Sequence, residues 1–157
     1  MNPTAEHQWL TRLVGDWTFS LPAPKTDNAR VTTIEGTETY RALGPLWVIG
    51  DAVAPLADGG LSESRMALGW DPQRRRFVGT RILSTTPSLW VYDGEGDPDG
   101  RRLRLYTEGP AAEGATHSEP LLDVIAFVDA NSRTLTRHTK AADGSWTAVL
   151  TVEYRRR

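Results

Sequence analysis

Short runs of β-branched and aromatic residues, separated by turn residues, constrain the fold of this chain more than any other feature of its sequence. After residue 16 these runs follow one another almost to the C-terminus, which predicts an all-β chain. Ten runs are predicted as strands: 17–21, 30–41, 47–53, 63–70, 76–83, 89–95, 102–108, 121–129, 134–140 and 146–155.

The segments between several runs are typical of tight turns. They read DPQR at 71–74, DPDG at 97–100, DANS at 129–132 and ADGS at 142–145, where proline presets φ and glycine accepts a positive φ. Strands that are neighbours in sequence should therefore pair in antiparallel fashion. A meander of ten strands removes its two unpaired edges by closing into a barrel. The long connection 109–120 is expected to form a loop over the barrel mouth.

One short helix is expected before the first strand. Asn2 can act as its N-cap, Pro3 suits the first helical position, and Gly15 supplies a C-terminal stop. The apolar stripe consists of Trp9, Leu10, Leu13 and Val14.

Composition narrows the classes of partner. The 157 residues are predicted to form one domain, 1–157, and the formal net charge of −2 gives no electrostatic reason to bind nucleic acid or an anionic membrane. The absence of cysteine excludes disulfides and thiolate chemistry and favours a reducing compartment. The N-terminal residues do not resemble an export signal, and no run is as long as a membrane span. A cytoplasmic location is expected.

Gly15-Asp16-Trp17, after a short helix and at the head of the first strand, resembles the G-x-W signature of calycin barrels, the group of lipocalins and fatty-acid-binding proteins. The resemblance implies that Trp17 plugs the closed end of the barrel under an arginine of the last strand, here Arg155, Arg156 or Arg157. Over nearly its whole length the chain also resembles DUF1579, a bacterial family of unknown function. The matching segments are LWVIGD at 46–51, ALGWDPQRRRFVGT at 67–80, LWVYDGEGDPDG at 89–100 and DGSWTAVLTVEYRR at 143–156. The implied fold is an antiparallel up-and-down calycin-like barrel of about ten strands with a short N-terminal helix.

The hairpin around DPDG decides which aromatic residues face inward. A three-residue loop, 98–100, pairs Tyr92 with Tyr106 and Trp90 with Glu108. One face then carries these four residues, and the other carries Leu89, Val91, Leu103 and Leu105. If the aromatic face points inward, it lines a ligand pocket or simply fills a core. In that arrangement the aliphatic face lies on the outer surface of the barrel. If the two faces are reversed, the aromatic residues lie on the outer surface instead. Both arrangements predict a homo-oligomer such as a homodimer.

The direction of His138 depends on the next hairpin. A two-residue turn at Asp143-Gly144 points Arg137 inward, whereas a three-residue loop pairs His138 with Ala148 and points the histidine inward. The second arrangement would allow haem binding through His138, as in some small calycin-like barrels. The sequence DWTFS lacks the further glycines of those barrels, so no cofactor is expected.

Metal and catalytic motifs are not found in the sequence. DGEGDPDG at 93–100 begins like a calcium loop, but Pro98 and Arg104 occupy the positions that require glycine and a bidentate acid. No nucleophile elbow, phosphate loop or dinucleotide fingerprint is present, so an enzyme is the alternative rather than the first interpretation. The titratable residues that strand alternation could aim into a barrel are Glu38, Tyr40, Glu108, Asp123, Arg137 and His138.

The sequence therefore predicts a barrel that binds a small apolar or aromatic molecule. A filled barrel acting as an interaction module is a further alternative. The candidate binding residues are Glu38, Tyr40, Trp47, Trp90, Tyr92, Tyr106, Glu108, Arg137 and His138.

Overall fold

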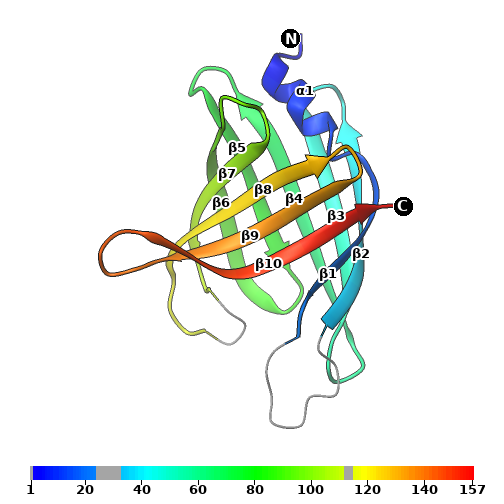
Figure 1. Ribbon diagram of the computed structural model, residues 1–157, viewed down its shortest axis with the longest axis vertical. Coiled ribbons are helices and arrows are strands. Elements are labelled where there is room, and N and C mark those ends of the chain that lie inside the picture. The colour runs from blue at the N-terminus through cyan, green and yellow to red at the C-terminus, as the bar shows by residue number, and fades with distance from the viewer. Residues whose placement is uncertain (1, 24–32, 112–114) are drawn as a thin grey trace.

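The computed structural model describes residues 2–23, 33–111 and 115–157, and these form one closed antiparallel barrel of ten strands (Figure 1). Each strand pairs with its neighbours in sequence, and the last strand closes on the first, with Trp17 opposite Arg156. The strands are β1 (Gly15–Pro22), β2 (Thr33–Leu43), β3 (Trp47–Pro55), β4 (Leu61–Asp71), β5 (Arg76–Leu83), β6 (Thr86–Gly96), β7 (Arg102–Gly109), β8 (Glu119–Asp129), β9 (Ser132–Lys140) and β10 (Trp146–Arg156). The predicted all-β barrel of ten strands is confirmed.

Two expectations fall partly on residues that are not described. The second strand was predicted from residue 30, but 30–32 lie outside the described residues, and β2 is described from Thr33. The connection 109–120 contains residues 112–114, which also lie outside them.

The helix α1 (Ala5–Thr11) is shorter than predicted and lies at one end of the barrel (Figure 1). Its N-cap is Thr4 rather than Asn2, and the Thr4 backbone N–H donates to Nδ1 of His7 at 3.0 Å. Gly15 does not end the helix but begins β1 with a φ of 129°. L side chains rarely adopt this φ, so the position favours glycine, and a Cβ there would also displace the end of the Arg156 side chain, whose Nη1 would lie 2.5 Å away. No helix in the described part of the chain is long and apolar enough to span a bilayer.

Trp17 closes the barrel beside α1, as predicted from the G-x-W signature. Its side chain has no exposed surface, and its indole N–H donates to the Leu13 carbonyl at 2.8 Å. The guanidinium of Arg156 stacks 4.2 Å from the ring centre, and that of Arg133 lies 4.6 Å from it. Arg156 also donates to the carbonyls of Val14 and Arg12, which ties the last strand to the end of the helical segment. Of the three candidate arginines, Arg156 is therefore the one that covers Trp17.

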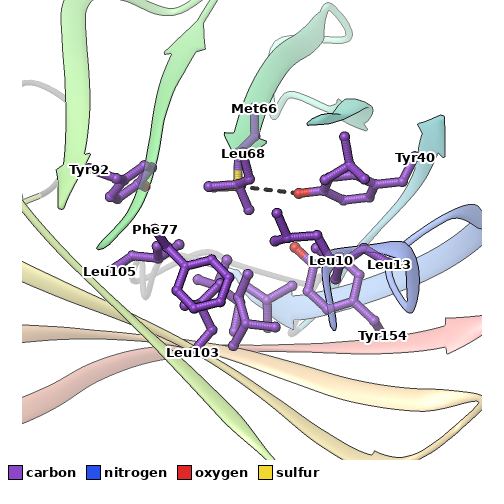
Figure 2. Packing of buried hydrophobic residues seen from close by; sticks show 14 of the residues in the cluster. Leu10, Leu13, Tyr40, Met66, Leu68, Phe77, Tyr92, Leu103, Leu105 and Tyr154 are labelled. Atoms are coloured by element: carbon purple, nitrogen blue, oxygen red, sulfur yellow. Dashed lines mark hydrogen bonds between the residues drawn. The ribbon is translucent and has the colours of Figure 1, made fainter. Parts of the chain in front are cut away.

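The half of the barrel nearest α1 is filled with side chains (Figure 2). Leu10 and Leu13 enter from the helical segment and meet inward-facing residues of the strands. The Tyr40 hydroxyl donates to the sulfur of Met66 at 3.2 Å, which satisfies a buried polar group within this apolar layer (Figure 2). The fully buried strand residues of this half include Leu68, Leu103, Leu105 and Ile125. These packed side chains close the barrel at the end nearest α1, and we call this layer the packed floor.

Candidate functional site

Beyond the packed floor the barrel contains a cavity of about 520 Å³. Its size falls within the usual range for small-molecule sites, which is roughly 300–1,000 Å³. Apolar side chains supply most of the wall, and a few polar side chains interrupt it. The inward-facing residues of the wall include Phe19, Leu21, Glu38, Ala52, Ser62, Ser64, Arg81, Leu83, Trp90, Leu135, Arg137, Leu150, Val152 and Tyr154.

Asp123 and Arg137 form a buried ion pair beside this cavity. The Arg137 guanidinium donates to both carboxylate oxygens of Asp123, at 2.9 and 2.8 Å, and the Tyr92 hydroxyl donates to the same carboxylate at 2.7 Å. Burial acts to raise the pKa of Asp123, but the hydrogen bonds and charge of Arg137 outweigh it and lower that pKa below its ordinary value. The carboxylate is therefore ionised, and Arg137 is held on the cavity wall, 5.7 Å from the Trp90 ring centre.

A second ion pair joins Glu38 on β2 to Arg133 on β9. The Arg133 guanidinium lies against aromatic rings, 3.6 Å from the ring centre of Tyr154 and 5.6 Å from that of Tyr40. Both members of the pair are buried, so the pair acts as an internal cross-link between two strands that are separated by β1 and β10. Glu38 reaches the cavity wall, whereas Arg133 belongs to the floor.

Arg81 is the third arginine that points into the barrel, and it lines the cavity from β5. Its register neighbours are Met66 on β4 and Trp90 on β6. Burial acts to lower the pKa of Arg81, but nearby groups, among them the carboxylates of Asp123 and Glu38, raise it above its ordinary value. Among the residues that the structure describes, none forms a hydrogen bond or ion pair with Arg81. This guanidinium remains charged at any pH at which the protein is folded.

Three buried tyrosines predict a loss of stability in alkali. Burial raises the pKa of Tyr40, Tyr92 and Tyr154 above 10, their ordinary value, and the nearby carboxylates raise it further. Because the folded state favours the neutral phenols, this stabilisation is complete below pH 10 and is lost as the pH rises above it. Urea unfolding at pH 7, 9, 10 and 11 should show a free energy that falls above pH 10. A flat profile between pH 9 and 11 would contradict the burial of these phenols.

The predicted pairing of β6 with β7 is wrong by one residue. Tyr106 pairs with Asp93 rather than with Tyr92, because the turn is closed between Asp97 and Arg102 and holds four residues instead of three. A slip of one residue sends every side chain of a strand to the opposite face. Trp90 and Tyr92 consequently face inward with Leu103 and Leu105, whereas Tyr106 and Glu108 lie on the outer surface with Leu89 and Val91.

The aliphatic face from which self-association is predicted has fewer exposed residues than expected. Leu89 and Val91 are 56% and 60% exposed, but Leu103 and Leu105 are fully buried inside the barrel. The outer face of this hairpin is therefore mixed in character, with Tyr106 and Glu108 beside the two aliphatic residues.

A bulge on β10 decides the direction of His138. The turn contains three residues, 142–144, and His138 does pair with Ala148, but Val149 is then skipped and Arg137 pairs with Leu150. Arg137 thus points inward and His138 outward, where its Nδ1 lies 3.1 Å from the Leu122 carbonyl oxygen. Neither of the two simple turns considered from the sequence contains this bulge.

The structure brings only part of the predicted set together. Glu38, Trp90 and Arg137 line the cavity. Tyr40 and Tyr92 are buried inside the barrel, but neither lines the cavity wall. Trp47, which is 39% exposed, lies on the outer face and packs on Gly69, where a Cβ would lie 2.4 Å from its ring.

Sequence reasoning missed Arg81, Phe19, Leu150 and Tyr154 as cavity residues. Strand alternation could have found Arg81, because Phe77, Gly79 and Arg81 occupy every second position of β5.

The sequence family described as "Protein of unknown function (DUF1579)" matches residues 2–156. The chain belongs to the DUF1579 family. The match confirms the resemblance stated from the segments at 46–51, 67–80, 89–100 and 143–156. The function of the DUF1579 family is unknown, and this member of it folds as a ten-strand barrel.

No curated protein matches this DUF1579 member. Among solved structures, it is similar to a redesigned β-barrel with 14% identity and a TM-score of 0.47, covering 94% of this chain and 93% of that one. It is also similar to the redesigned barrel mFAP0 bound to DFHBI, with 12% identity, a TM-score of 0.46 and coverage of 92% and 99%. A third similar structure, EF1p2_mFAP2b bound to DFHBI, has 11% identity, a TM-score of 0.48 and coverage of 96% and 98%.

Proposed function

We propose that this DUF1579 member binds a small, largely apolar molecule in the open half of its barrel. The observation that carries the proposal is the cavity of about 520 Å³, which lies above a fully packed floor. Apolar walls around a few fixed polar groups are the usual composition of a ligand site. A chain selected only for stability would be expected to fill this volume, because empty space lowers stability.

Two polar groups of the wall, Arg137 and Glu38, are held in place before a ligand arrives. Arg137 is fixed by both oxygens of Asp123, and Glu38 by Arg133. Rigid polar groups orient a ligand without an additional loss of side-chain entropy. Binding rather than catalysis is favoured, because the arginine of each pair neutralises its own carboxylate. Neither Glu38 nor Asp123 is therefore free to act as a general base.

A cavity-filling substitution tests the proposal. The neutral fluorescent probe 1-aminoanthracene should bind the wild-type protein saturably with one site per chain, measured by fluorescence titration. Ser64→Trp places a large side chain in the cavity and should weaken this binding by about tenfold or more, equivalent to at least roughly 1.4 kcal/mol.

Glu63→Trp is the matched control, because Glu63 is the preceding residue of β4 and is exposed on the outer face. It should leave the affinity for the probe unchanged. The proposal fails if the wild-type protein shows no saturable binding, or if both tryptophan variants weaken binding equally.

A further inference from the structure

The cavity wall formed by β3 and β4 consists of small side chains. The inward-facing residues are Ala52 and Ala54 on β3 and Ser62 and Ser64 on β4, and all four line the cavity. They form two register pairs, Ala52 with Ser64 and Ala54 with Ser62. Neighbouring strands lie about 5 Å apart and alternate residues of one strand about 7 Å apart, so these four positions form a flat area of roughly that size. We call the four residues the small-residue shelf.

Packing against neighbouring side chains does not explain the small size of the shelf residues. Gly36 on β2 and Gly50 on β3 also face inward, and an added Cβ at these positions would run into the rings of Phe19 and Tyr40. These glycines are therefore small because aromatic rings cover them. The shelf residues line open cavity instead, although protein interiors are normally filled to high density.

Larger side chains line the opposite wall of the cavity. The strand order places β9 across the barrel from β4, with β10 next to it (Figure 1). Leu135 on β9 and Leu150 on β10 both line the cavity. The space is thus bounded by a flat surface on one side and by branched aliphatic side chains on the other. A rigid ring system suits this space, because its face contacts the whole shelf at once and it loses no internal rotation on binding.

The free polar groups beside this space are hydrogen-bond donors. The hydroxyls of Ser62 and Ser64 form no hydrogen bond with another described residue. Trp90 also lines the cavity and is only 3% exposed, and its indole N–H has no acceptor among the described residues. The carboxylate of Glu38, which could accept, is bound by Arg133. Because the free donors are uncharged, a neutral acceptor such as a carbonyl oxygen satisfies them without bringing a charge into the cavity.

We propose that the ligand is a flat ring system that carries a carbonyl oxygen, and that the small-residue shelf selects for both properties. This inference rests on the proposed function and specifies its ligand class. The ring face lies over the two alanines of β3, and the carbonyl edge lies over β4, where the two serine hydroxyls donate to the oxygen. Leu83 on β5 and Glu38 on β2 pair with shelf residues and limit the sideways movement of the ring.

Three uncharged probes of similar size separate the two properties. 9-Fluorenone is flat and has a carbonyl, fluorene is flat and has none, and benzophenone has the carbonyl on two rings that are twisted out of one plane. Each is measured at pH 7.5 by its displacement of bound 1-aminoanthracene. The wild-type protein should bind 9-fluorenone at least about fivefold more tightly than either of the others, which corresponds to roughly 1 kcal/mol. Burial of apolar surface alone would favour fluorene, the most apolar of the three.

Removal of both shelf hydroxyls tests the contact with the carbonyl. In the double variant Ser62→Ala with Ser64→Ala, the affinity for 9-fluorenone should fall to that for fluorene, whereas the affinity for fluorene should not change. The infrared carbonyl band of bound 9-fluorenone provides a second readout, because a hydrogen bond lowers its frequency. The band should lie at higher frequency in the double variant than in the wild type. A purely structural role of the serines would change neither the band nor the preference.

Ala52→Val tests the flatness of the shelf by adding a branched side chain to it. The substitution should abolish the advantage of 9-fluorenone over benzophenone, because the flat ring no longer contacts the whole shelf. Ala67→Val is the matched control, since Ala67 lies on the outer face of β4 between the inward-facing Met66 and Leu68. This variant should keep both preferences. Valine suits a strand at either position, and thermal unfolding without ligand verifies that each variant is folded.

The outcomes separate this inference from the proposed function. If 1-aminoanthracene and all three probes fail to bind, the proposed function fails. If the probes bind but 9-fluorenone has no advantage over fluorene, or none over benzophenone, the cavity is a binding site and the assigned ligand class is wrong. The assignment is also wrong if 9-fluorenone keeps its advantage over fluorene in the double serine variant, or its advantage over benzophenone in Ala52→Val.

Discussion

Asp123→Asn should lower the free energy of unfolding by about 3 kcal/mol, the lower end of the range for breaking a buried ion pair. The substitution keeps the volume of the side chain but leaves the Arg137 guanidinium without its counter-charge and weakens the bond with Tyr92. The lower end is expected because 13% of the Arg137 side chain is exposed and can reach water. Urea unfolding at pH 7 measures the loss.

Asp51→Asn provides the matched control. Asp51 makes the same kind of contact with Arg65, at 2.6 Å, but the two side chains are 44% and 57% exposed. Exposed pairs contribute up to about 1 kcal/mol, so this variant should stay close to wild type. The double variant Asp123→Leu with Arg137→Met should recover much of the stability, because it removes both charges. Equal losses for Asp123→Asn and Asp51→Asn would contradict the buried position of the Asp123 pair.

Trp17→Ala should lower the free energy of unfolding by about 3–5 kcal/mol, the usual cost of truncating a buried aromatic residue. The change leaves a void beside Phe127, whose ring centre lies 6.5 Å from that of Trp17, and removes the surface on which Arg156 and Arg133 stack. The hydrogen bond from the indole to the Leu13 carbonyl is lost with it. Thermal and urea unfolding followed by circular dichroism measure the effect.

Trp47→Ala is the control for this substitution, because Trp47 lies on the outer face over Gly69 and keeps 39% of its surface exposed. Its loss should cost about 1 kcal/mol. Where Trp17→Ala does not fold well enough to measure, Trp17→Phe keeps a ring but loses the hydrogen bond to Leu13, and it should still be less stable than wild type. Equal effects at Trp17 and Trp47 would show that Trp17 does not close the barrel.

The strand pattern and the closed topology were predictable because each depends on local sequence. Runs of β-branched and aromatic residues between tight turns give the ten strands, and the need to remove exposed edges gives the closure between β1 and β10. The role of Trp17 was predictable from the G-x-W resemblance, and the structure selects Arg156 among the three arginines that could cover it.

The composition of the site depends on register, which is why it was harder to predict. One additional residue in the β6–β7 turn moves Tyr106 and Glu108 to the outer surface. One bulged residue, Val149, sends Arg137 inward and His138 outward although the turn length alone suggested the reverse. Alternation along a single strand specifies neither feature, because a shift of one residue leaves the alternation intact and only changes the face that points inward.

The pairing of buried charges required the three-dimensional structure as well. Asp123 and Arg137 lie opposite each other on β8 and β9, but Glu38 and Arg133 belong to strands at distant points of the chain. That Arg81 makes no direct hydrogen bond or ion pair with the described residues is likewise visible only in three dimensions. Alternation along β5 shows that it faces inward, but not that the described carboxylates around it bind other partners.

A methyl NMR titration with 1-decanol tests the division of the barrel into a packed floor and a ligand cavity. Binding in the cavity should shift the methyl signals of Leu83 and Leu150 and leave those of Leu68 and Leu103 at their original positions. Shifts confined to Leu89 and Val91 on the outer face would contradict the account, because they would place the apolar binding surface outside the barrel.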